Sequence, residues 1–87
     1  MNEGNMRLYI IQFGERNVCG RNIRKMREKA GVSHEQLAAK LQLLGHNISQ
    51  KAISRTETGD RMIRDFELIL YSEVLNIPIH ILFDLSR

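Results

Sequence analysis

A polar segment at residues 47–59, NISQKAISRTETG, carries side chains that can form hydrogen bonds with the bases of a nucleic acid. Such bonds read base edges in the major groove of double-stranded DNA, where arginine can pair bidentately with guanine. The same segment also fits an ordinary polar surface helix. If it is helical, its outward polar positions are Gln50, Lys51, Ser54 and Arg55.

The charge of the chain is distributed unevenly along its length. The net charge is +3, but residues 16–64 carry eleven basic against four acidic residues, a net of +7, and residues 65–87 carry a net of −3. A basic surface that only keeps a helical face soluble would explain the number of charges but not this asymmetry. The asymmetry indicates that one end of the domain faces a polyanion.

Length and cysteine content restrict the class of protein. A chain of 87 residues fits one small domain with a single core. Cys19 is the only cysteine, which excludes an internal disulfide and is typical of a reducing compartment. No secretory pattern and no apolar run of membrane-spanning length are visible, so we expect a cytoplasmic protein without a membrane partner.

Enzymatic or metal chemistry has no visible basis in the sequence. A nucleophile beside a base, paired carboxylates or a phosphate-binding glycine loop would be required, and none is found. The three histidines are far apart and lack a cysteine at ligand spacing, so each is expected to be a polar surface group. We therefore expect no enzyme, no metal and no cofactor. The histidines are His34, His46 and His80.

Helical periodicity and helix-end residues predict five short helices from Gly20 onward. The first ends at Gly31, the second has a capping box of Ser33 and Gln36 and ends at Gly45, and the third is capped by Ser49 and closed by Gly59. The inward positions of these three helices are predicted to be Ile23, Met26 and Ala30; Leu37, Ala38, Leu41 and Leu44; and Ala52, Ile53 and Thr56.

The last two helices are predicted from the residues that begin and end them. The fourth is started or capped by Asp65 and stops at Asn76. The fifth begins at Pro78, whose missing N–H costs nothing in a first turn. Their apolar positions are Phe66, Ile69, Leu70 and Leu75, followed by Ile79, Leu82 and Phe83.

The fold class predicted is an all-α compact bundle of five short helices, preceded by an N-terminal arm or short strand. Residues 1–17 form the arm and residues 18–87 the helical domain. Residues 1–17 contain the stretch MRLYIIQF, which is rich in residues that favour strands. We expect it to be an arm, a lone strand or an edge that pairs with a second chain.

The stretch VSHEQLAAKL followed by NISQKAISRTETG resembles the helix-turn-helix of lambda-repressor-like, Cro-type regulators, also called the xenobiotic response element family. The resemblance covers residues 18–83, with GRNIRKMREKAG before and DFELILYSEVLNIPIHILF after the motif. It implies that a recognition helix at about residues 49–57 lies in the major groove, while the start of the second helix lies against the DNA backbone.

The resemblance also implies roles for individual residues. Arg55 would contact guanine, Gln50 adenine or a phosphate, and Lys51 guanine or a phosphate, with Ser54 able to reach either. Residues placed near DNA phosphates are His34, Ser49, Thr58, Arg61 and Arg64. A structural salt bridge between the first helix and the end of the third would join Arg27 and Glu57.

Three features depart from the pattern of this family. His34 stands where relatives have glutamine, and Thr56 stands where they have a large apolar residue, so the core behind the third helix is expected to be thinner. The connection QLLGHNI is longer than in the compact motif. We interpret QLL as an extra turn of the second helix that ends at Gly45.

The function predicted is sequence-specific binding of double-stranded DNA by a transcriptional regulator that acts as a repressor. The alternative is a protein-interaction module of the same fold, such as an antitoxin with a protein partner. A homodimer is expected because one small domain contacts only a half-site. Dimerisation would use the RLYIIQF segment or, as we favour, the C-terminal helices through Tyr71, Ile79, Ile81 and Leu85.

Overall fold

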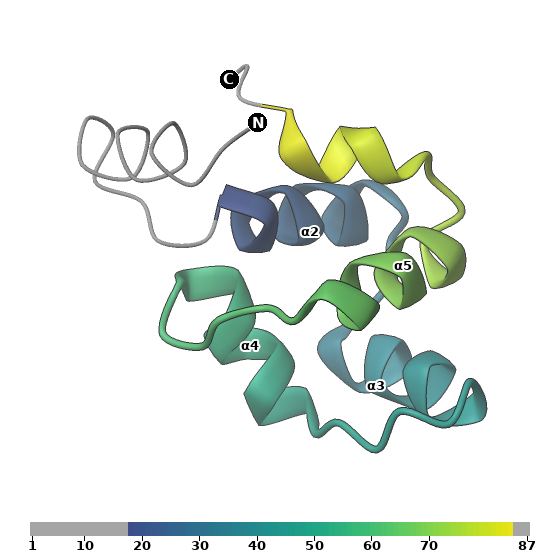
Figure 1. Cartoon of the computed structure of the whole chain (residues 1–87). Coiled ribbons are helices and arrows are strands. Elements are labelled where there is room, and N and C mark those ends of the chain that lie inside the picture. Colours follow the sequence, from purple (N-terminus) through teal and green to yellow (C-terminus); the bar gives the residue numbers. More distant parts are fainter. Residues whose placement is uncertain (1–17, 85–87) are drawn as a thin grey trace.

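The computed structural model describes residues 18–84, and this part of the chain contains helices and no strand (Figure 1). The all-α prediction is confirmed for these residues, although the fifth helix is a single 3-10 turn. The predicted arm of residues 1–17 and the dimer residue Leu85 lie outside the described residues. The elements are α2 (Val18–Lys29), α3 (His34–Leu43), α4 (Gln50–Thr58), α5 (Asp65–Val74) and the 3-10 helix η1 (Ile79–Phe83).

Local capping interactions begin α3 and α4 at the predicted residues. The Ser33 hydroxyl accepts a hydrogen bond from the Gln36 backbone N–H at 3.0 Å, and the Gln36 side chain accepts from the Ser33 N–H at 2.9 Å. The Ser49 hydroxyl accepts from the Ala52 N–H at 3.1 Å. Each cap satisfies backbone donors that lack a partner inside the helix, which fixes where the helix begins.

The connection between α3 and α4 has the predicted extra helical turn. Gln42 and Leu43 continue α3, and Gly45 follows with a φ of 91°, in the left-handed region that favours glycine. The Gln42 side chain donates a hydrogen bond to the Ile48 carbonyl at 3.2 Å. This bond holds the connection against the end of α3.

The core lies where α2, α3, α4, α5 and η1 pack against one another. In Figure 1, α2 lies between η1 and α4, and the structure packs α3 against both α4 and α5. The Asn22 side chain in α2 donates to the carbonyls of Leu82 and Asp84 at 3.0 and 2.7 Å, which joins the end of the chain to α2. The buried apolar residues are Cys19, Ile23, Leu37, Ala38, Leu41, Ile48, Ile53, Tyr71, Leu75 and Leu82.

Several predicted core positions are wrong because α5 presents a different face. The buried residues of α5 and its cap are Glu67, Tyr71 and Leu75, spaced four apart on one side, so Phe66 and Ile69 face away. Tyr71 is fully buried and cannot contribute to a dimer surface as predicted. The other predicted core residues that are exposed are Ala30 and Leu44, which follow their helices, and Ile79 and Phe83 in η1.

The length of the helices bears on membrane association. No helix within residues 18–84 is both long and apolar enough to cross a membrane.

Candidate nucleic-acid interface

Helix α4 has one polar exposed face and one buried face. Gln50, Lys51 and Arg55 are exposed and Ser54 is half-buried, whereas Ile53 is fully buried on the opposite side. Within residues 18–84, these four polar side chains form no hydrogen bond or ion pair. Their donors and acceptors are therefore available to a ligand, while Ile53 holds the helix on the core.

The N-terminal end of α4 suits an anionic partner. The first turn contains no acidic residue, and the positive end of the helix dipole at Ser49 favours negative charge. Thr58 is the last residue of α4. Gly59 follows in the left-handed conformation, with a φ of 87°, and ends the helix. The helix thus begins with a phosphate-compatible terminus and stops after Thr58.

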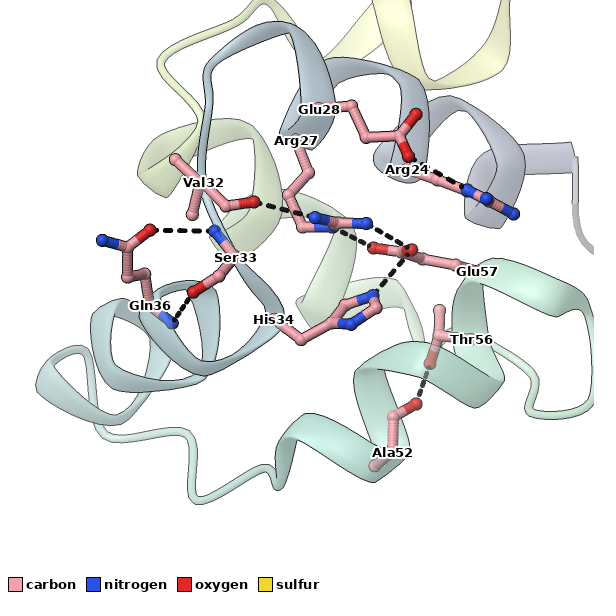
Figure 2. Close-up of polar contacts among 10 residues, drawn as sticks. All are labelled: Arg24, Arg27, Glu28, Val32, Ser33, His34, Gln36, Ala52, Thr56 and Glu57. Atoms are coloured by element: carbon pink, nitrogen blue, oxygen red, sulfur yellow. Dashed lines mark hydrogen bonds and ion pairs between the residues drawn. The ribbon is translucent and has the colours of Figure 1, made fainter.

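The end of α4 is joined to α2 by a buried ion pair (Figure 2). The Arg27 guanidinium donates to both carboxylate oxygens of Glu57, from Nε at 2.7 Å and from Nη2 at 3.2 Å. Arg27 also donates from Nη1 to the Val32 carbonyl at 2.8 Å. The hydrogen bond with Glu57 raises the pKa of Arg27, so the guanidinium stays charged.

His34 joins the same cluster from the start of α3. Its Nε2 lies 3.0 Å from Oε1 of Glu57, and Figure 2 shows the imidazole directed toward that carboxylate. The side chain remains 34% exposed. The imidazole therefore connects the start of α3 with the end of α4, which places the two helices of the motif relative to each other.

A second buried carboxylate, Glu67 in α5, is bound by residues from both sides of α4. Arg61 Nη2 lies 2.8 Å from Oε2 and Arg61 Nη1 lies 3.1 Å from Oε1. His46 Nε2 lies 2.7 Å from Oε2, and the Arg64 backbone N–H donates to Oε1 at 2.8 Å. Burial alone would raise the pKa of Glu67, but the hydrogen bonds from Arg61, Arg64 and His46 outweigh it and lower that pKa.

His46 is not the surface group that the sequence predicts. Its side chain is 16% exposed, its imidazole binds Glu67, and its ring meets the Phe66 ring edge-on with centroids 5.2 Å apart. The prediction is wrong because His46, in the connection between α3 and α4, lies against Phe66 and Glu67 in the first turn of α5. His46 thereby becomes part of the polar interior.

Thr56 stands in α4 where the family resemblance implies a large apolar residue. It is fully buried, and its hydroxyl donates to the Ala52 carbonyl at 2.9 Å and accepts from Arg61 Nη1 at 3.1 Å. A buried hydroxyl is tolerated when it is hydrogen-bonded in this way. The core beside α4 is thus partly polar. Through Arg61 it is connected to the Glu67 cluster, which consists of Glu67, Arg61, His46 and the Arg64 backbone N–H.

The side chains expected near DNA phosphates divide into two groups. Ser49, Thr58 and Arg64 are exposed around α4, although the Thr58 hydroxyl lies 3.1 Å from both the Arg55 carbonyl and an Asp60 carboxylate oxygen. His34 and Arg61, by contrast, direct their side chains toward the buried carboxylates of Glu57 and Glu67.

Sequence reasoning missed Glu67 and His46 as residues that support this interface. Glu67 stands three residues after the cap of α5, Arg64, which is the spacing of a reciprocal capping contact. That spacing could have indicated its backbone contact. The residue at the cap has no hydroxyl, so the usual sequence signature is incomplete, and no local signal marks His46.

Comparison with known proteins places this arrangement in a family. A family profile described as helix-turn-helix matches residues 23–82, from within α2 to η1. No curated protein and no solved structure matches the chain. The matched region contains α3, α4 and the supporting clusters. The chain belongs to the lambda-repressor-like, Cro-type helix-turn-helix family of DNA-binding domains, also called the xenobiotic response element family.

Proposed function

We propose that the domain reads specific sequences of double-stranded DNA through α4 in the major groove. The observation that carries this proposal is the exposed polar face of α4, whose side chains have no partner within residues 18–84. Arg55 is proposed to contact guanine, Gln50 adenine or a phosphate, and Lys51 guanine or a phosphate, with Ser54 beside them. Membership of a DNA-binding family supports this use of the face.

Contacts with the sugar-phosphate backbone are proposed to surround α4. The backbone at Ser49, the Thr58 hydroxyl and the Arg64 guanidinium are the exposed candidates. Arg61 and His34 remain near this surface, and we propose that they act mainly by holding α4 through Glu67 and Glu57. Phosphate contacts supply affinity without sequence preference and make it depend on salt.

We further propose that the protein is a repressor that binds as a homodimer, since a two-fold operator offers two half-sites. With Tyr71 buried, the exposed Ile79 and half-buried Ile81 remain from the C-terminal surface expected to pair. Sedimentation at high concentration, with and without DNA, tests the dimer. Only a monomer under both conditions would contradict it.

An antitoxin-like protein partner is supported by a different part of the surface. Leu43 is 87% exposed at the end of α3, and Phe66 and Ile69 are exposed on α5. These exposed apolar side chains are the candidates for contact with a protein, and they are not on α4. Binding a protein there is therefore compatible with DNA binding by α4.

Selection of bound sequences from random duplex DNA is the experiment that tests the central proposal. Enrichment of one short sequence, followed by tighter binding to it than to a scrambled duplex, is the expected result. Equal affinity for both duplexes at several salt concentrations would refute sequence-specific reading. A reporter gene with the enriched site inside its promoter then tests repression. A repressor should lower the expression of this gene when the protein is present.

A further inference from the structure

One buried carboxylate binds the connections on both sides of α4. His46 lies in the connection before this helix and Arg61 in the connection after it, and both bind Oε2 of Glu67, at 2.7 and 2.8 Å. Glu67 itself belongs to α5 and is fully buried. Both flanks of α4 thus meet at a single fixed point on another helix.

The packing of the helices gives this contact a particular importance. The main helix contacts of α5 are with α3 and η1, whereas those of α4 are with α2 and α3. The Glu67 cluster is therefore a direct polar connection between α5 and the flanks of α4. It also reaches α4 itself, because Arg61 donates to the Thr56 hydroxyl at 3.1 Å.

We propose that His46 and Arg61 are positioning residues that set the register of α4 on DNA through Glu67. This inference rests on the proposed function of α4. A buried ion pair adds little net stability compared with apolar packing, but it has few alternative geometries. Base contacts require side chains held to within a fraction of an ångström, and contacts to phosphates from flexible side chains tolerate more displacement.

His46 allows the proposal to be tested without removing the Arg61–Glu67 pair. His46→Ala removes the imidazole, and His46→Leu removes the hydrogen bond but keeps apolar contact with Phe66. His46→Gln retains an N–H donor and serves as the conservative variant. Leu82→Ala provides a matched destabilised control, because Leu82 is buried in η1, which packs on α2 and α5.

Affinity is measured for the enriched duplex and for a scrambled duplex, at a temperature at which circular dichroism shows each variant to be folded. The expected result is that His46→Ala and His46→Leu lose about tenfold in affinity for the enriched duplex, the loss typical of one base contact, and keep their affinity for the scrambled duplex. His46→Gln and Leu82→Ala are expected to keep the wild-type ratio of the two affinities. If His46→Ala does not fold, His46→Leu carries the test.

The NMR chemical shifts of the backbone amides of residues 49–59 provide a second measurement, on the protein without DNA. We expect His46→Leu to shift amides at both ends of α4 and Leu82→Ala to leave them in place. Unchanged amides, or His46 variants that retain the wild-type ratio, would overturn the inference and leave the proposed function standing. A wild-type protein that binds both duplexes equally would instead overturn the proposed function, and this inference with it.

Discussion

Replacing Arg55 by alanine isolates the reading of bases from the stability of the fold. The Arg55 side chain is exposed and forms no hydrogen bond or ion pair within residues 18–84. Its carbonyl still accepts from the Asp60 N–H at 2.9 Å, a backbone contact that alanine keeps. Alanine also favours a helix. We therefore expect the free energy of unfolding to change by less than about 0.5 kcal/mol.

The effect on DNA binding should be much larger than the effect on folding. A lost bidentate contact with guanine costs about 1–3 kcal/mol, which corresponds to roughly 5- to 150-fold in affinity for the enriched duplex. The preference at one base pair should relax at the same time, because the contact that distinguishes that pair is gone. Arg64→Ala is the matched control, since Arg64 is also exposed and is proposed to contact a phosphate.

The assay measures the affinity of both variants for the enriched and scrambled duplexes over a series of salt concentrations. Arg64→Ala is expected to lower the affinity for both duplexes by the same factor. It should also reduce the slope of log affinity against log salt by about 0.9. Arg55→Ala should reduce the ratio between the duplexes. If that ratio is unchanged, α4 does not read sequence through Arg55, and its polar face is better explained as a solvated surface.

Three further predictions concern the Glu67 carboxylate with its partners and the buried Cys19. Arg61→Ala leaves the Glu67 carboxylate buried with fewer partners, so it should lower the free energy of unfolding by about 3 kcal/mol. Urea denaturation measures this change, and an unchanged midpoint would contradict it. Since the pKa of Glu67 is lower in the folded than in the unfolded chain, its contribution to stability is complete above the ordinary carboxyl pKa near 4.3 and is lost as pH falls through the lower folded value. Urea melts should therefore show stability falling below about pH 4, and Glu67→Gln should flatten this fall. Burial raises the pKa of Cys19 to about 11, so the folded protein should react slowly with a thiol reagent at neutral pH, and reaction as fast as in urea would refute its burial.

The sequence by itself determined where α3 and α4 begin and where α4 ends. The Ser33 and Gln36 capping box, the Ser49 cap and the stop at Gly59 join groups at most four residues apart, so their geometry follows from neighbours along the chain. The polar face of α4 was equally visible, because helical spacing decides which residues lie opposite Ile53.

Only the tertiary structure decided which face of α5 is buried and which polar groups surround Glu67. Apolar residues occur on several sides of α5, so periodicity alone does not choose the side of Tyr71 over that of Ile69. His46 and Glu67 are 21 residues apart, and nothing in the sequence predicted that they meet. Arg27 and Glu57 are 30 residues apart, and their pairing was predicted only because the chain resembles a known family. Glutamate is rarely buried, and its burial depends on partners that the packing of separate helices brings together. Contacts of this kind have no signature in the local sequence, because the packing of the helices creates them.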